Sequence, residues 1–306
     1  MDFLFLRLNS SKMFNDFLQH IKFQKRCSEH TVTAYRTDLE QFSLFLLNTY
    51  SSENLAEADF PQLRAWVVAL SELKLDTRSI NRKMATLRTF YGYLLKNKTI
   101  IVDPTLKLKA LKTDRTLPTF VREKEMDTLL DDIDFGNDFE GLRDKLVIEL
   151  LYGTGMRLAE LIGLKDSDID AYQRTLTVLG KRNKHRVIPI HQNLFALIQS
   201  YQAIRQNTLK FSANLLIVTN LGNATYPMLI QRIVKKYLSL VSTLDKKSPH
   251  VLRHTFATHL LNKGADINAI KDLLGHSSLA ATQIYTHNSI EKLKETYLKA
   301  HPKSGI

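Results

Sequence analysis

The 306-residue sequence predicts a mainly α-helical protein with a small β-sheet, divided into an N-terminal helical domain and a C-terminal mixed α+β domain. Three observations support this prediction. Apolar residues recur at helical spacing through the first hundred positions, whereas convincing strand-like alternation begins only after residue 170. A basic segment that follows a proline separates the two regions. We therefore expect a helical domain at residues 1–105, a linker at 106–118 and a mixed domain at 119–306.

The first domain is expected to contain four amphipathic helices. Their starting signals are the apolar series from Met13 to Ile21, an N-cap at Ser28, Asp59 with Pro61, and an N-cap at Asp76 or Thr77. Each helix carries one apolar stripe, so the four stripes can bury one another in a small bundle. The fourth helix also carries arginines away from its stripe, which predicts a basic face.

The second domain is expected to mix helices with a β-hairpin. Helices are predicted over Arg122–Ile133, Leu142–Tyr152 and Met156–Leu161, with Gly153 and Gly155 ending the second, and another begins at Ser248-Pro249. Strands are predicted at Thr175–Leu179, Arg186–Ile190 and near Leu215–Val218. The intervening Gly180–Lys184 segment has the composition of a hairpin turn.

The charge of the chain points to a polyanionic partner. The net charge is +12, and the segment from Arg78 to Arg115 contributes +8 of it, with ten basic residues against two acidic ones. We expect the DNA-binding residues of this region to be Arg78, Arg82, Lys83, Arg88, Lys107, Lys109 and Lys112. A solvated helix face and a solvated linker remain the alternative interpretations.

Several classes of protein are disfavoured. No apolar run is long enough to cross a bilayer, and the N-terminus lacks the pattern of a signal peptide. Cys27 is the single cysteine, so an internal disulfide is excluded and a reducing cytoplasmic location is expected. His250, His254 and His259 lie close in sequence, but Val251 occupies the glutamate position of a zinc helix. No nucleotide-binding glycine loop is present, so we expect neither a metal nor a cofactor.

Six residues form a set suited to phosphoryl transfer: Arg157, Lys181, His250, Arg253, His276 and Tyr285. Arginines bind phosphate oxygens, lysine and histidine move protons, and a tyrosine beside cations can attack phosphorus. His250 and Arg253 share one face near a helix start, where phosphate is favoured. Each residue taken alone also has an ordinary structural interpretation, such as a local ion pair of Arg157 with Glu160 or a half-buried Tyr285.

The ordered combination resembles the tyrosine recombinases, most closely the bacterial Xer type. The matching segments are Gly153–Leu161 (GTGMRLAEL), Gly180-Lys181, His250–Leu260 (HVLRHTFATHL), Leu273–His276 (LLGH) and Ile284–His287 (IYTH). The resemblance extends over nearly the whole chain. It departs from the family at Arg182, where the lysine hairpin commonly has glycine, and this residue puts the conformation of the hairpin in question.

The resemblance implies a SAM-like core-binding domain followed by a tyrosine-recombinase catalytic domain. Tyr285 would be the nucleophile, forming a 3′-phosphotyrosine with DNA, and the other five residues would activate the phosphodiester. The family acts as a tetramer on two duplexes, here with copies of itself or with a sister recombinase, and a DNA translocase often controls it. A C-terminal helix around Tyr297 would be exchanged between neighbours, with packing on its own domain as the alternative. A mobile-element integrase, a type IB topoisomerase and a non-catalytic DNA-binding regulator remain alternatives.

Overall fold

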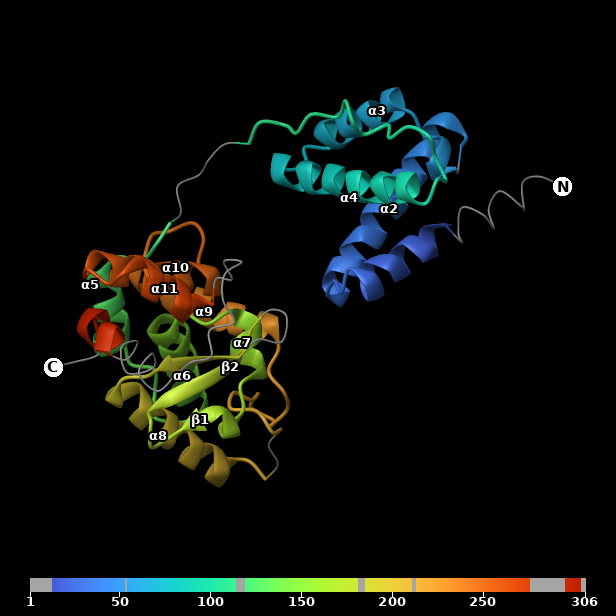
Figure 1. Cartoon of the computed structure of the whole chain (residues 1–306). Helices are drawn as coiled ribbons and strands as arrows, with labels where there is room; N and C mark the ends of the chain where they lie inside the picture. The colour runs from blue at the N-terminus through green and yellow to red at the C-terminus, as the bar shows by residue number, and fades with distance from the viewer. Residues whose placement is uncertain are drawn as a thin grey trace. The chain divides into compact units, whose positions relative to one another are not determined.

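The computed structural model describes residues 13–52, 54–113, 119–180, 185–210, 213–275 and 295–303. The chain divides into two compact units, Met1–Thr116 and Leu117–Ile306 (Figure 1). Each unit has its own hydrophobic core. None of the helices within these ranges combines the length and apolar character needed to span a membrane.

The first unit is a bundle of helices whose starts match the predicted signals. Residues 13–19 are helical and continue into a π-helical turn, η1 (His20–Gln24), followed by α2 (Glu29–Tyr50), the 3-10 turn η2 (Leu55–Glu57), α3 (Phe60–Glu72) and α4 (Thr77–Lys96). The side chains of Ser28, Asp59 and Asp76 each accept a hydrogen bond from a backbone N–H in the first turn of the following helix. The apolar stripes meet in one core that includes Phe42, Trp66 and Phe90.

The segment after α4 is attached to the first unit. The side chain of Asn81 pairs with both the backbone N–H and the carbonyl of Leu111, at 2.8 and 2.9 Å. Arg88 donates to the carbonyl of Leu108, and the Leu108 side chain is buried in the core of this unit. Much of the predicted linker therefore packs on α4, and the division between the units falls at residues 116–117.

The second unit combines helices with a three-stranded antiparallel sheet. Its elements are α5 (Glu123–Asp127), the π-helical turn η3 (Thr128–Asp132), α6 (Phe139–Thr154), α7 (Leu158–Gly163), η4 (Asp166–Asp168), β1 (Ile169–Asp170), β2 (Thr175–Leu179), β3 (His185–Pro189), α8 (Gln192–Thr208), α9 (Pro227–Val241), α10 (Pro249–Asn262) and α11 (Ile267–Leu274). The strands pair in the order β1-β2-β3, with Thr175 opposite Pro189 and Leu179 opposite His185. Figure 1 shows α8 near the sheet and α10 and α11 at the other end of the unit.

Helix α6 is the centre of the second unit. Twelve of its sixteen residues are buried, so the helix is covered by other elements on nearly every side. Asp138 begins the helix by accepting a bond from Gly141 N–H at 2.7 Å, and Gly155 ends it in the left-handed conformation, with φ of +61°. The buried helix thus delivers its C-terminal turn to a fixed position within the unit.

The predicted fold class is confirmed, with local differences. The strand predicted near Leu215–Val218 is not formed: Leu216, Ile217 and Val218 are buried, but the segment consists of bends and one isolated bridge from Val218 to Ala224. The predicted helix over Arg122–Ile133 divides into α5 and the π-helical turn η3. Ser248 precedes α10 as predicted, but its side chain makes no capping bond, and its carbonyl accepts from Val251 N–H instead.

Candidate active site

The end of α6 orients Arg157. Thr154 stabilises the turn there, because its hydroxyl donates to the carbonyl of Leu150 at 2.5 Å and accepts from the N–H of Met156 at 3.2 Å. Gly155 then reverses the chain, and two residues later Arg157 is the N-cap residue of α7. Its side chain is 34% exposed, which leaves the guanidinium accessible from solvent.

Glu160 connects Arg157 to a second arginine. Its carboxylate accepts the backbone N–H of Arg157 at 2.7 Å and the Arg157 guanidinium at 2.9 Å, as the local ion-pair interpretation predicted. Arg186 on β3 donates to both oxygens of the same carboxylate, at 2.7 and 2.8 Å. Burial alone would raise the pKa of Glu160, but these bonds and charges lower it below its usual value. The carboxylate is therefore ionised and fully bonded.

Arg253 reaches the same place from α10. Its guanidinium donates to the carbonyl of Gly155 at 2.5 Å and to the carbonyl of Leu274 at 2.7 Å. Burial and the nearby charges of Arg157 and Arg186 lower the pKa of Arg253 to about 10. That value keeps the group protonated at neutral pH, so it remains a cation suited to an anionic ligand.

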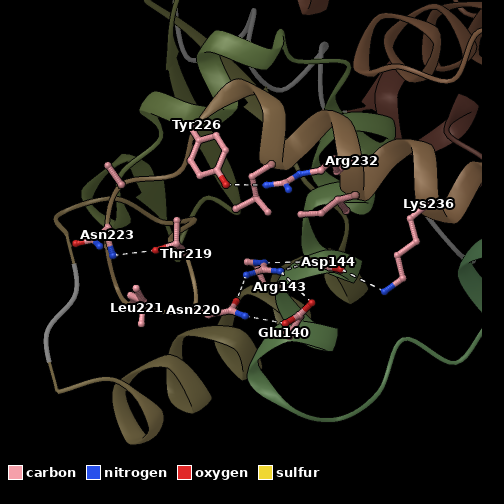
Figure 2. A pocket seen from close by; sticks show the side chains of 13 residues that line it. Glu140, Arg143, Asp144, Thr219, Asn220, Leu221, Asn223, Tyr226, Arg232 and Lys236 are labelled. Atoms are coloured by element: carbon pink, nitrogen blue, oxygen red, sulfur yellow. Dashed lines mark hydrogen bonds and ion pairs between the residues drawn. The ribbon is translucent and has the colours of Figure 1, made fainter.

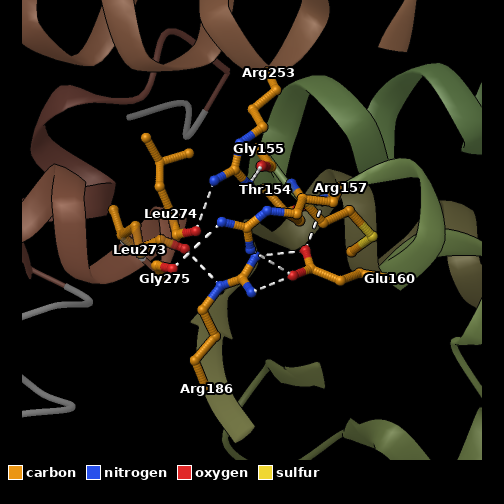
Figure 3. A network of polar contacts seen from close by, with 10 residues as sticks. Thr154, Gly155, Arg157, Glu160, Arg186, Arg253, Leu273, Leu274 and Gly275 are labelled. Carbon is orange, nitrogen blue, oxygen red and sulfur yellow. Dashed lines mark hydrogen bonds and ion pairs between the residues drawn. The ribbon is translucent and has the colours of Figure 1, made fainter. Parts of the chain in front are cut away.

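The C-terminus of α11 is where the three arginines meet. The successive carbonyls of residues 273, 274 and 275 receive bonds from Arg186 at 2.8 Å, Arg253 at 2.7 Å and Arg157 at 3.4 Å (Figure 3). Cations at this end of a helix also interact favourably with its dipole. We call Arg157, Glu160, Arg186 and Arg253 the arginine network. It holds three guanidinium groups and one carboxylate, so it carries a net charge of +2.

The structure brings together two of the six predicted residues, Arg157 and Arg253. His250 lies on the first turn of α10, one turn before Arg253, and is exposed. Lys181, His276 and Tyr285, as well as Arg182, lie outside the described residues. The adjoining positions are known: β2 and β3 flank residues 181–184, and Gly275, with φ of +64°, ends α11 immediately before His276.

Two family models match the chain. The phage integrase family model covers residues 119–292, and the model of its N-terminal SAM-like domain covers residues 14–98. The chain belongs to the phage integrase family of tyrosine recombinases. The matched segments cover both units described above, and the larger match contains the whole arginine network.

Curated relatives agree with this assignment. The chain is 37% identical to the tyrosine recombinase XerC of Chlorobaculum parvum, over 94% of this chain and 93% of the relative. It is 37% identical to XerC of Thermodesulfovibrio yellowstonii, over 97% of this chain and 98% of the relative. It is 36% identical to XerC of Staphylococcus aureus, over 94% and 96%. This protein is a site-specific tyrosine recombinase.

Solved structures share the fold at lower identity. One is the XerH site-specific recombinase bound to a difH substrate, with a TM-score of 0.70 and 22% identity over 93% of this chain and 84% of that chain. Another is the Tn1549 transposon integrase in complex with transposon right end DNA, with a TM-score of 0.68 and 21% identity over 92% and 98%. These likenesses support the two-domain recombinase fold of this chain.

The C-terminal segment of this recombinase packs against its own second unit. Tyr297 is fully buried and donates to the carbonyl of Gly153 at 2.7 Å, and His301 stacks on the Tyr297 ring with centroids 5.0 Å apart. Lys303 pairs with Asp127 at 2.9 Å and with Asp131 at 2.5 Å. In this single chain the segment lies at the end of its own α6, and its exchange with a neighbouring protomer stays a prediction.

Beneath this segment lies a buried polar cluster. The carboxylate of Glu149 and the ring of His191 come within 3.9 Å of each other, and neither Glu149 Oε2 nor His191 Nε2 has a hydrogen-bond partner within the described part of the chain. Burial raises the pKa of Glu149 to about 7 and lowers that of His191 to about 4. His191 is therefore neutral at neutral pH, whereas Glu149 takes up or loses its proton close to neutral pH.

The residues predicted to bind DNA differ in their surroundings. Arg78, Arg82, Lys107, Lys109 and Lys112 are exposed, and Arg88 is half-buried. Lys83 is buried: its ammonium group pairs with Asp38 at 2.9 Å and with Gln41 at 2.5 Å. Lys83 was therefore wrongly grouped with the surface cations, because helical periodicity places it beside the core residues Ile80 and Met84.

Histidines on α10 have structural contacts. The Nε2–H of His259 donates to the carbonyl of Val121 at 3.0 Å, so its Nδ1 accepts from the hydroxyl of Tyr152 at 2.9 Å. Both ring nitrogens are used in this way. No group of three or more potential metal ligands is found among the described residues.

A separate pocket of about 670 Å³ lies between the start of α6, the start of α9 and the loop of residues 219–226 (Figure 2). Its charges are paired within it. Arg143 donates to Asp144 at 2.7 Å and contacts Asn220, and Arg232 donates to the hydroxyl of Tyr226 at 2.7 Å. None of the lining residues belongs to the arginine network. Arg143 thus joins α6 to the loop through Asn220, while its pair with Asp144 lies within α6, and these contacts have a structural role.

Arg186 is a site residue that was not predicted from the sequence. Its contacts are with residues 26 and 87 positions away, which no local pattern reveals. One signal was available: Arg186 lies two positions before Ile188 in β3, so the two side chains share one face of the strand, and that face is buried. A buried arginine requires a partner, and this position therefore points to a network.

Proposed function

We propose that this recombinase cuts and rejoins DNA at a specific site through a 3′-phosphotyrosine formed by Tyr285, and that it resolves chromosome dimers at segregation. The observation that supports the proposal most is the convergence of Arg157 and Arg253, from helices nearly a hundred residues apart in sequence, on one network with net charge +2. The relatives named XerC favour the chromosomal role over that of a mobile element.

The arginine network suits the charge of the reaction. A phosphodiester carries one negative charge, and the transition state of nucleophilic attack carries two on its phosphoryl oxygens. Arg157 is held by the Glu160 carboxylate and the Gly275 carbonyl, and Arg253 is held by two carbonyls. Each uses two of its five N–H groups in this way, so further N–H groups remain to donate to the phosphoryl oxygens. Donors that are fixed before the reaction stabilise the developing charge without reorganisation.

Proton transfers are assigned to the remaining candidates. In this proposal Tyr285 attacks phosphorus as its proton leaves toward His250, and the bond to the 5′ oxygen breaks. Lys181 gives a proton to that leaving oxygen, and His276 donates a hydrogen bond to the phosphoryl group. The phosphotyrosine retains the energy of the phosphodiester, so the free 5′-hydroxyl of another strand can rejoin it without ATP or another cofactor.

The proposed partner is double-stranded DNA bound by a tetramer on two duplexes. The tetramer would contain copies of this chain or of a sister recombinase, under the control of a DNA translocase. The exposed cations Arg78, Arg82, Lys107, Lys109 and Lys112 would contact phosphates along the core-binding domain, with Arg88 holding the segment that carries three of them. The resulting affinity would decrease with salt.

The test is covalent trapping from the organism's own fragmented chromosomal DNA, followed by sequencing of the fragments bound to the protein. We expect one chromosomal locus, no adduct from Tyr285→Phe, and loss of most adduct from Arg157→Gln. Fragments that map to the ends of a mobile element would identify an integrase instead. If the folded wild-type protein bound DNA and formed no adduct, it would be a regulator and the catalytic proposal would be wrong.

A further inference from the structure

Arg186 is the most constrained cation in the arginine network. It is 4% exposed, and all three of its nitrogens donate: Nη1 and Nη2 to the carboxylate of Glu160, and Nε to the carbonyl of Leu273 at 2.8 Å. The bidentate geometry fixes both the distance and the plane of the carboxylate. Because Arg186 is buried and its nitrogens are already bonded, its role is to hold other groups and not to bind substrate.

The contact with Glu160 affects Arg157. Four hydrogen bonds reach the Glu160 carboxylate, two from Arg157 and two from Arg186. Without Arg186, the charge of Glu160 would be balanced by Arg157 alone, and the network charge would fall from +2 to +1. The Arg157 guanidinium would then be drawn into a closed ion pair. Arg186 thus leaves part of the charge and the donors of Arg157 for an anion.

The contact with Leu273 affects the end of α11. It is the first of the three successive carbonyls that arginines hold, and a Cβ on Gly275 would lie 3.0 Å from Cδ of Arg186. Arg186 is also the second residue of β3, five positions after Lys181 in the sequence. One side chain therefore links the segments that carry Arg157, Lys181 and His276.

We propose that Arg186 is a positioning residue for strand cleavage: by clamping Glu160 and the last turn of α11, it orients the guanidinium of Arg157 toward the scissile phosphate. This inference rests on the proposed function, in which Arg157 binds that phosphate. It assigns Arg186 no contact with DNA.

A matched control exists in the same unit. Arg205 is also buried, at 6% exposed, and it donates to one carboxylate, Asp166 at 2.6 Å, and to the carbonyls of Leu215 and Leu216. Arg186→Lys and Arg205→Lys each replace a buried guanidinium by an ammonium group and so keep the positive charge. Only Arg186 belongs to the arginine network. Differences between the two variants report on position and not on the general cost of replacing a buried arginine.

The experiment uses the full-length chain and a nicked duplex that carries the sequence trapped on Tyr285. DNA affinity and the rate of adduct formation at saturating protein are measured for both variants. We expect Arg186→Lys to keep its affinity within about threefold and to lose about 10- to 100-fold in rate, the size expected for a misplacement of about 1 Å. Arg205→Lys should react within about twofold of wild type, with a lowered melting temperature.

A second duplex has a methylphosphonate at the scissile position, which removes one charged oxygen. The penalty of Arg186→Lys should be several-fold smaller on this duplex, because the neutral linkage depends less on the orientation of Arg157. Equal penalties on both duplexes, or equal rates for the two variants, would overturn the proposal.

The orientation of Arg157 is also measurable without DNA. The Nε–H signal of Arg157 in nitrogen-15 NMR spectra should move in Arg186→Lys and stay in place in Arg205→Lys. An unmoved signal in Arg186→Lys would refute the positioning role even if wild type formed no adduct. Failure of the wild-type protein to form an adduct would instead refute the proposed function.

Discussion

Replacing Gly155 by alanine tests how the end of α6 builds the active site. Gly155 has φ of +61°, and a Cβ there would lie 2.4 Å from Cδ1 and 2.8 Å from Cε1 of Phe256. The left-handed conformation costs a residue with a Cβ about 1 kcal/mol. The Phe256 ring is fully buried and is itself packed near Tyr297 and His301, so it cannot move freely.

The backbone cost and the overpacking against Phe256 together give the expected loss of stability. Overpacking of this kind costs about 2 kcal/mol, so the free energy of unfolding should fall by about 3 kcal/mol in total. For a unit of this size, residues 117–306, each kcal/mol corresponds to roughly 2–4 °C, so the melting temperature should fall by roughly 6–12 °C. Adduct formation should also fall, because the carbonyl of Gly155 holds Arg253.

Calorimetry or circular dichroism of the full-length chain measures the shift. Gly163→Ala is the matched control, since it lies in α7 with no atom within 4 Å of its Cβ and without a positive φ. It should leave the melting temperature unchanged or slightly raised. If Gly155→Ala melted within about 1 °C of wild type, the account of this turn would be wrong.

Three further predictions concern stability. Asp38→Asn leaves the buried ammonium group of Lys83 without its carboxylate and should lower the free energy of unfolding of the first unit by about 3–5 kcal/mol. Urea unfolding followed by the fluorescence of the single tryptophan measures this change, and an unchanged midpoint would contradict the buried pair. Tyr297→Phe removes the hydrogen bond to the Gly153 carbonyl, which contributes about 1–2 kcal/mol to stability, and should speed proteolysis of the C-terminal segment. Phe23→Leu, an exposed change in the other unit, is the control and should leave the proteolysis rate unchanged. Burial raises the pKa of Glu149 to about 7, so its contribution to stability is full below about pH 4.5 and is lost as pH rises through 7. The melting temperature of wild type minus that of Glu149→Gln should therefore fall over this range, and the difference is the quantity to measure because His191, with its pKa lowered to about 4, acts in the opposite direction in both proteins; a difference that stayed constant from pH 4.5 to 7 would contradict the raised pKa of Glu149.

The sequence predicted the features of the fold that depend on neighbouring residues. Ser28, Asp59 and Asp76 cap helices by bonds that reach only two or three positions along the chain. The hairpin of β2 and β3 and the glycine that ends α6 are equally local. Such signals act within one turn of helix or one strand pair, so residue spacing is sufficient to find them.

Features that depend on distant partners were missed or misplaced. Lys83 was counted as a surface cation although its spacing places it beside core residues, and Asp38, the partner that permits its burial, lies 45 positions away on α2. Leu215–Val218 is buried without forming a ladder, although its apolar composition is that of a strand. The apolar face around Tyr297 packs at the end of α6 in this chain, and exchange with a neighbour stays a prediction because the sequence pattern does not distinguish the chain's own packing site from a neighbour's.

The candidate site shows why a list of residue types stops short of a mechanism. Arg157 and Arg253 were found as cations that could bind phosphate, but their strength as catalysts depends on what holds them. Carbonyls at the ends of α6 and α11 fix Arg253, and Glu160 fixes Arg157. Arg186 prevents Glu160 from cancelling the charge of Arg157. A network held at +2 matches a transition state with two negative charges better than a ground state with one, so its geometry favours the reaction over simple binding.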